Sequence, residues 1–154
     1  MSPRAAARLE RLGFNDVYDY VPGKADWLAN GLPVEGELAG EERIGDLARG
    51  DAPVCSMDES LDEVRERLVN SNWEICVVVN DESVVLGLLH ESDLPDEDDG
   101  DLETLIDYGP KTFRPDGSLD DATEYFESSS DDVALVTTNL GELLGVVRAD
   151  DLLE

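Results

Sequence analysis

The sequence of 154 residues is poor in basic side chains, which number 11 against 38 Asp and Glu and leave a net charge of −27. Because nucleic acids and anionic membranes are bound through Lys and Arg, we expect neither of them as a partner. Only two of the basic residues are lysines. Such Asp-rich, Lys-poor surfaces suit a salt-rich cytoplasm, where ions screen self-repulsion, although the composition also fits an ordinary soluble acidic protein.

The sequence also lacks long apolar segments. No run approaches the roughly 20 residues that a membrane-spanning helix needs, and the first residues, MSPRAAARLERLGF, contain no apolar core of a signal peptide. The apolar content of 41% is nevertheless sufficient for a buried core. We therefore expect a soluble, cytoplasmic protein with one compact domain, or one domain and an appendage.

Cysteine and histidine are scarce as well. Cys55 and Cys76 are too few for a disulfide scaffold or a four-cysteine zinc site, and they fit a reducing compartment. His90 is the only histidine, no Gly-x-Ser-x-Gly sequence is present, and these three residues do not have metal-ligand spacing. We expect neither a catalytic residue nor a bound metal.

What the sequence does contain is an internal repeat. The stretch VVLGLLHESDL at 84–94 returns at 142–152 as ELLGVVRADDL. A shift of 58 residues aligns Gly87 with Gly145, and the same shift aligns the two aspartates near the end of each stretch. Further identities continue without a gap over residues 44–94. A repeat of this length indicates two copies of one structural unit.

Each copy is predicted to fold as a strand, a helix, two strands and a short helix. In the first copy, Ser60 and Glu63 form a capping box at the start of a helix over 60–71. β-branched runs predict strands at 75–79 and 84–89, joined by a turn. The remaining expected segments are strand 54–55 and a short helix near 92 in the first copy, and strands 112–113, 133–138 and 143–148, helix 118–129 and a short helix from 149 in the second.

The predicted fold class is therefore α/β or α+β, with the domain boundaries 1–38 for an appendage, 39–96 for the first unit and 97–154 for the second. The acidic stretch PDEDDGD at 95–101 is expected to be a solvated spacer. The appendage is predicted to be a helix over 3–12, a strand over 16–20 and a short helix that carries Trp27, which either contacts a partner or anchors the segment on the repeat.

The tandem units resemble a pair of CBS domains, the regulatory modules of the cystathionine-β-synthase type. The resemblance covers about residues 44–154 and rests on the order of elements and on the paired Gly-x-x-x-x-x-Asp strand ends. It implies one pseudo-twofold disc with two clefts, which in this family often bind adenosine-containing ligands, and discs that often dimerise. We expect a non-catalytic, ligand-sensing homodimer; the alternative is a structural dimerisation module with unoccupied clefts.

The resemblance also implies site residues. In the family, a Ser or Thr after the strand contacts phosphate, and an acid three residues later binds ribose hydroxyls. Asp93 and Asp151 keep the acid, whereas His90 and Arg148 replace the hydroxyl. Arg148 can itself contact phosphate, and His90 can do so when protonated. The expected ligand is AMP, ATP or S-adenosylmethionine. By position in the family pattern, the adenine side is lined by Val54, Val77, Thr112 and Leu135. The competing interpretation is that the two acids only cap helices and the other four only pack in the core.

Residues 4–36 resemble the C-terminal end of a rhodanese-like domain, in the pattern Leu-Gly-Phe-x-x-Val followed by Gly-x-x-x-Trp-x-x-x-Gly-x-Pro. Rhodaneses carry their catalytic cysteine in a loop before the first helix of this pattern, where the chain has only Met1, Ser2 and Pro3. We therefore expect no sulfurtransferase activity. A weaker alternative is the regulatory part of a sulfurtransferase whose catalytic half is missing.

Overall fold

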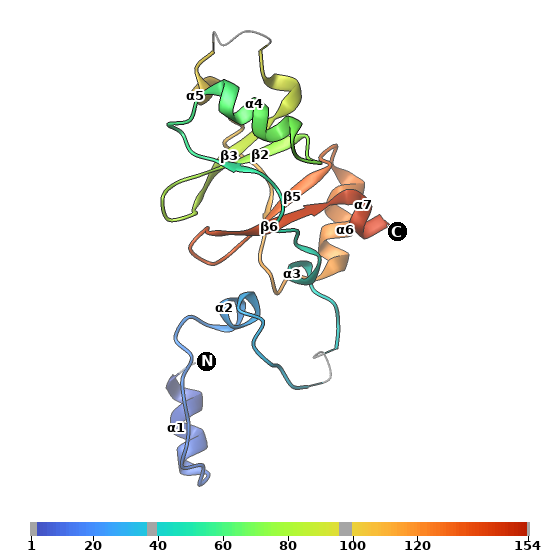
Figure 1. Ribbon diagram of the computed structural model, residues 1–154. Helices are drawn as coiled ribbons and strands as arrows, with labels where there is room; N and C mark the ends of the chain where they lie inside the picture. The colour runs from blue at the N-terminus through green and yellow to red at the C-terminus, as the bar shows by residue number, and fades with distance from the viewer. Residues whose placement is uncertain (1–2, 37–39, 96–99, 154) are drawn as a thin grey trace.

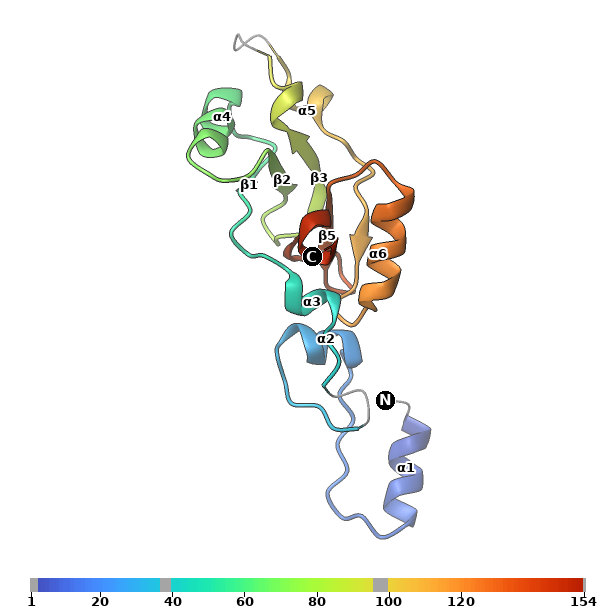
Figure 2. The same cartoon turned by 90° about the vertical axis from the view of Figure 1, so that its right-hand side faces the viewer.

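A computed structural model describes residues 3–36, 40–95 and 100–153, and it has a mixed α+β fold with two three-stranded sheets (Figure 1). The two sheets belong to the two copies of the repeat, and Figure 2 shows the long helices α4 (Leu61–Val69) and α6 (Leu119–Ser128) on opposite sides, with the sheets between them. Residues 96–99, the middle of the predicted acidic spacer, lie outside the described residues.

The first unit contains β1 (Val54–Cys55), α4 (Leu61–Val69), β2 (Ile75–Val79), β3 (Val85–His90) and the 3-10 helix η1 (Glu91–Asp93). Strand β1 runs parallel to β2, and β2 is antiparallel to β3. The capping box at the start of α4 is confirmed. The Ser60 amide donates to Glu63 Oε2 at 3.0 Å, and the Glu63 amide donates to Ser60 Oγ at 3.4 Å.

The second unit repeats this order with β4 (Thr112–Phe113), α6 (Leu119–Ser128), β5 (Val133–Thr137), β6 (Leu143–Arg148) and α7 (Ala149–Leu153). The strand registers are also equivalent, because Val78 pairs with Gly87 and Val136 pairs with Gly145. The predicted repeat of strand, helix and two strands is confirmed in both copies.

Three apolar clusters form the core. One lies between α4 and its sheet and contains the helical stripe Leu61, Val64 and Leu68, each no more than 3% exposed. A second lies under α6 and is built around Ala122 and Phe126. The third joins the two units and contains Trp73, which precedes β2, together with residues of both sheets, namely Ile75, Val77, Leu88, Leu135 and Val146. The two units therefore share an apolar interface.

The units also exchange the segments that precede them. The short helix α3 (Ile44–Leu47) comes before the first unit, yet Ile44 is buried in the core of the second. The segment after α5 (Leu102–Leu105) comes before the second unit, yet Ile106 is buried in the core of the first. These two four-residue helices were not predicted from the sequence, and each of them connects a unit to its neighbour.

Close packing of the exchanged segments explains why both copies contain a glycine in the third strand. A Cβ on Gly87 would lie 2.6 Å from the carbonyl oxygen of Asp107 and would also clash with Ile106. A Cβ on Gly145 would lie 2.8 Å from the carbonyl oxygen of Arg49. Both positions need glycine because another backbone lies directly against the strand.

The appendage contains α1 (Pro3–Arg11) and α2 (Lys24–Ala29), and α1 lies apart from the sheets in both views. The predicted strand over 16–20 is wrong, because these residues have no regular secondary structure and form no β-ladder with a described segment. Instead, the ring of Tyr20 packs edge-on against Trp27 at 5.0 Å. The Trp27 indole donates to the Pro33 carbonyl at 2.9 Å, so these contacts of Trp27 stay within the appendage.

Candidate functional site

A cleft of about 1010 Å³ lies between the two units. It is formed where β2 and β5 begin and where β3 and β6 end, and the segment 107–111 contributes to its wall. The two strand ends that carry the repeated motif therefore open into one shared cleft. His90 and Arg148, both predicted as ligand contacts, are among the residues that line it.

Arg148 crosses the cleft from the second unit to the first. Its guanidinium lies 3.8 Å from the centre of the Trp73 ring, in the geometry of a cation–π contact. Its Nη2 donates a hydrogen bond to the Asn72 carbonyl oxygen at 2.7 Å. Arg148, which stands where the CBS resemblance implies a Ser or Thr, is thus held by Trp73 and Asn72 of the opposite unit.

Trp73 is a site residue that the sequence analysis missed. The side chain is 4% exposed, lines the cleft and belongs to the apolar cluster between the units. Its Nε1 is buried and has no hydrogen-bond partner among the described residues. The sequence does mark this position, because the two copies differ there: the 58-residue shift aligns Trp73 with Asp131.

The charge of the cleft is mostly negative. Two permanent cations, Arg148 and Lys111, stand against six carboxylates, so the lining carries −4 with His90 neutral. Lys111 holds its ammonium group 5.0 Å from the Phe113 ring centre and 4.8 Å from that of Tyr125. The six carboxylates belong to Glu74, Glu91, Asp107, Asp131, Asp132 and Asp150. The cleft therefore repels a ligand that carries several negative charges.

The two motif aspartates lie beside the cleft. Asp93 is exposed at the end of η1, and Asp151 lies in the first turn of α7. Each follows a lining residue by one position, and neither is itself among the described residues that line the cleft. Asp151 Oδ1 accepts a hydrogen bond from Arg49 Nη2 at 3.1 Å, whereas its Oδ2 is buried without a hydrogen-bond partner in the described part of the chain.

The four residues predicted on the adenine side form two strand pairs. Val54 pairs with Val77, and Thr112 pairs with Leu135. Val77 and Leu135 are fully buried in the cluster between the sheets, whereas Val54 is 42% exposed and Thr112 is exposed. Core packing therefore accounts for two of these side chains. Their contact with a ligand stays a prediction.

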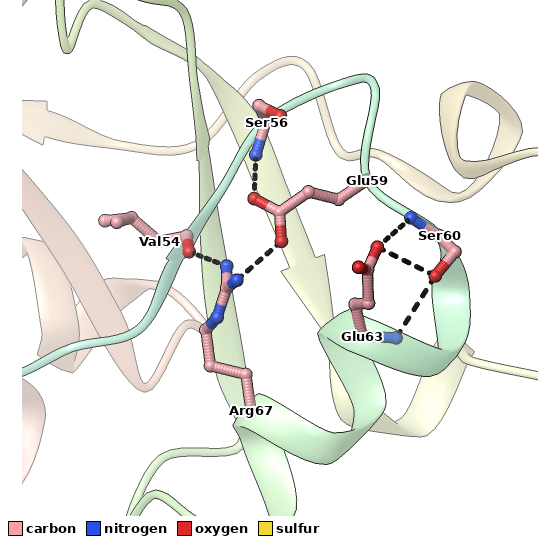
Figure 3. A network of polar contacts seen from close by, with 6 residues as sticks. All are labelled: Val54, Ser56, Glu59, Ser60, Glu63 and Arg67. Carbon is pink, nitrogen blue, oxygen red and sulfur yellow. Dashed lines mark hydrogen bonds and ion pairs between the residues drawn. The ribbon is translucent and has the colours of Figure 1, made fainter.

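The backbone of β1 is tied to α4 by a polar network (Figure 3). Arg67 donates to the Val54 carbonyl and forms an ion pair with Glu59 Oε2 at 2.6 Å. Glu59 Oε1 accepts from the Ser56 amide at 2.9 Å, which orients the carboxylate toward the arginine. The network fixes the turn between β1 and α4, and it raises the pKa of Arg67 through the hydrogen bond to Glu59.

The two cysteines lie side by side in the interior. Cys55 on β1 is 2% exposed and Cys76 on β2 is fully buried, and both are free thiols. A hydrogen bond with Cys55, together with burial, raises the pKa of the Cys76 thiol. The repeat predicts both as core fillers, since Phe113 and Ala134 occupy the sister positions, and both belong to the apolar cluster under α4.

A second hollow of about 860 Å³ lies between the appendage and the second unit. Its lining includes apolar residues such as Leu28, Leu32 and Leu144 and charged residues such as Arg43 and Asp46. Within the described ranges, no three His, Cys, Asp or Glu side chains are grouped to hold a metal ion. No helix of this part of the chain is long and apolar enough to cross a membrane.

The family model of the CBS domain matches residues 44–97 and 102–154, which are the two units with their exchanged segments. The chain belongs to this family, and it contains a tandem pair of CBS domains. CBS pairs are regulatory modules in general. The match does not extend to the appendage, and nothing beyond the sequence pattern supports its resemblance to a rhodanese. A search of curated proteins found no match to the chain.

Solved structures of CBS pairs share the fold at low sequence identity. The CBS domains of a transcriptional regulator from Streptococcus pneumoniae superpose with a TM-score of 0.66 at 14% identity, over 73% of this chain and 98% of that one. CBSX2, a CBS-pair protein of Arabidopsis thaliana solved in complex with AMP, has a TM-score of 0.65 at 19% identity, over 73% of this chain and 93% of that one. The CBS pair of protein MJ0100, in complex with 5′-methylthioadenosine and S-adenosyl-L-methionine, has a TM-score of 0.64 at 14% identity, over 71% and 91%.

Proposed function

We propose that the protein is a non-catalytic regulatory module that senses an adenosine-type metabolite in the cleft between its two CBS units. One observation carries the proposal: both repeated strand ends, with His90 and Arg148, line the same cleft. A ligand there contacts both units and the segments that they exchange. Its binding therefore changes how firmly the two halves of the disc are held together.

The chemistry of the cleft suits a nucleoside with a polar tail. Leu88, Ile75 and Val133 give it an apolar wall, and Arg148 supplies a planar fork for an anionic group. Asp93 and Asp151 stand one residue beyond the lining, where a carboxylate accepts two neighbouring ribose hydroxyls. The buried Oδ2 of Asp151 has acceptor capacity that the described residues do not use. AMP, ATP and S-adenosylmethionine remain the candidate ligands, and CBS pairs of the same fold were solved with such compounds.

A structural dimerisation module with an unoccupied cleft is the competing function. This function is favoured because two of the predicted ligand-binding residues already interact with other residues of the chain. Arg148 is bound to Asn72 and stacked on Trp73, and Asp151 is paired with Arg49. In this function the cleft is a structural joint, and adenosine compounds do not bind.

Homodimerisation is part of both functions. The buried residues of the apolar stripes on α4 and α6 pack inside the cores of the two units and are not available for a dimer interface. Val69, on the same helix as the first stripe, is 70% exposed and remains available to a partner. Light scattering at micromolar concentration is expected to report twice the mass of the chain. A monomer up to millimolar concentration contradicts the dimer.

The function is tested by a thermal-shift screen of adenosine, AMP, ATP and S-adenosylmethionine, followed by calorimetric titration of each compound that shifts the melting temperature. At least one is expected to bind, and Asp151→Ala is expected to weaken it about tenfold or more, because a charge-assisted hydrogen bond contributes about 1.5–3 kcal/mol. Asp151→Asn keeps part of the acceptor capacity and should weaken binding less. Asp58→Asn, an exposed substitution away from the cleft, is the matched control. If no compound gives heat or a shift at millimolar concentration, the sensing function is wrong.

A further inference from the structure

Arg148 is fixed in place before any ligand arrives. The Trp73 ring covers one face of the guanidinium, and the Asn72 carbonyl accepts from its Nη2. A free arginine side chain loses rotamer entropy when it is immobilised, and this group has already lost much of that freedom. The guanidinium carries five N–H donors, of which the bond to Asn72 uses one. A held guanidinium at a cleft wall binds one anionic group without further ordering.

The rest of the cleft does not favour a second anionic group. Six carboxylates line it, and the other permanent cation, Lys111, is stacked over the Phe113 and Tyr125 rings. A phosphate bound to Arg148 gains a bidentate, charge-assisted contact. Each further phosphate adds negative charge to a lining of −4 and meets no second held guanidinium among the described lining residues. Attraction at one point and repulsion elsewhere give a preference for a single phosphate.

We propose that the cleft selects a nucleoside monophosphate over the free nucleoside and over the di- and triphosphates. In this proposal Arg148 is the phosphate contact, and Trp73 is a positioning residue that acts through it. The proposal rests on the sensing function proposed above, and it adds the charge class of the ligand and the pair of residues that sets it. The pair is specific to one half of the disc, since the repeat places Asp131 and not an aromatic residue opposite Trp73.

The test is a calorimetric titration of adenosine, AMP, ADP and ATP into the full chain at low salt with EDTA, so that no divalent cation neutralises the phosphates. For the wild type, AMP is expected to bind about tenfold more tightly than adenosine, as one charge-assisted contact allows. Each phosphate beyond the first is expected to weaken binding about threefold or more. At molar KCl the difference between AMP and ATP should narrow, because the repulsion is screened.

Two charge-matched variants identify the phosphate contact. Arg148→Gln is expected to abolish the preference for AMP over adenosine, while Lys111→Gln, which removes the same charge from the same cleft, is expected to keep it. Trp73→Leu removes the aromatic face and should lower the ratio of AMP affinity to adenosine affinity. Trp73→Phe keeps an aromatic face and should restore most of that ratio. A purely structural role of Trp73 changes the melting temperature of the protein but leaves this ratio unchanged.

The outcomes separate the two proposals. If no compound of the series binds the wild type and S-adenosylmethionine does not bind either, the sensing function fails. If S-adenosylmethionine alone binds, the charge selection is wrong and the sensing function stands. If adenosine compounds bind but ATP binds as tightly as AMP at low salt, the charge selection is wrong and the sensing function stands. If Lys111→Gln rather than Arg148→Gln abolishes the preference, Arg148 is not the phosphate contact. Should Trp73→Leu fail to fold, Arg148→Gln and Trp73→Phe still decide the outcome.

Discussion

Asp107 and Leu88 exchange two backbone hydrogen bonds, from the Leu88 amide at 2.9 Å and from the Asp107 amide at 2.8 Å. They join the segment that leads into the second unit to the last strand of the first. Arg49 and Val146 make the equivalent pair of bonds in the other direction, each at 2.9 Å. The disc is therefore held by two reciprocal strand extensions, and both pass directly over the glycines of the repeat.

Substitution of Gly87 by alanine tests this arrangement. The added Cβ would meet the Asp107 carbonyl at 2.6 Å, and a backbone atom cannot move aside as a flexible side chain does. We expect Gly87→Ala to lower the free energy of unfolding by about 2–4 kcal/mol, measured by urea denaturation. Gly50→Ala is the control, because a Cβ there meets nothing within 4 Å. Equal stability of the two variants contradicts the close packing over Gly87.

The capping box of α4 predicts a pH dependence. Hydrogen bonds from the backbone amide and then the hydroxyl of Ser60 lower the pKa of Glu63. Since the folded pKa lies below the unfolded one, the carboxylate stabilises the fold above the unfolded pKa, and the contribution is lost as the pH falls through the folded pKa. The difference in melting temperature between the wild type and Glu63→Ala is therefore expected to be largest at neutral pH and to shrink in acid. Glu66→Ala, an exposed change on the same helix, is the control. A difference that stays constant down to strong acid contradicts the role of the charge.

The buried thiols are expected to be unreactive in the native protein. Burial keeps a thiol reagent from Cys55 and Cys76, and the raised pKa of Cys76 leaves little thiolate at neutral pH. Labelling with a disulfide reagent at pH 8 should be slow for the folded chain and should reach two thiols quickly in denaturant. Rapid, stoichiometric labelling without denaturant contradicts the placement of these residues in the core.

The net charge predicts stabilisation by salt. The folded chain has a net charge of −27 on 154 residues, so its acidic groups repel one another. Ions screen this repulsion, with a Debye length of roughly 3 Å at 1 M salt. The melting temperature is expected to rise steadily from low salt to molar KCl. Chloride is preferred to sulfate, because sulfate stabilises proteins through exclusion from their surface. A melting temperature that is flat or falls with KCl contradicts the self-repulsion.

Features encoded by local sequence were predictable. Runs such as Ile75–Val79 and the capping box at Ser60 determine their own strand and helix start, and the repeat transferred them to the second unit. The packing of α3 against the second unit could not be predicted, because a four-residue helix shows no hydrophobic periodicity and the residues that Ile44 contacts are far away in the sequence. The strand expected at residues 16–20 fits the local pattern, but it forms no ladder with any described segment.

The candidate site was also predictable only in part. The repeat identified His90 and Arg148 as equivalent positions, and both line the cleft. It did not identify Trp73, since the partner of Arg148 belongs to the other unit and its sister position is Asp131. A contact between two copies of a repeat is invisible when the copies are only aligned with each other.

An adenosine-type ligand in the cleft between the two units is expected to protect the backbone amides around it. Hydrogen exchange of the full chain, followed by mass spectrometry with and without saturating AMP, measures this protection. We expect slower exchange in the peptides that contain residues 72–75, 88–92, 107–111 and 148–150, and little change in the peptides of the appendage. Protection confined to residues 24–36 at the second hollow, or no protection anywhere at millimolar AMP, adenosine and S-adenosylmethionine, would contradict binding in the cleft.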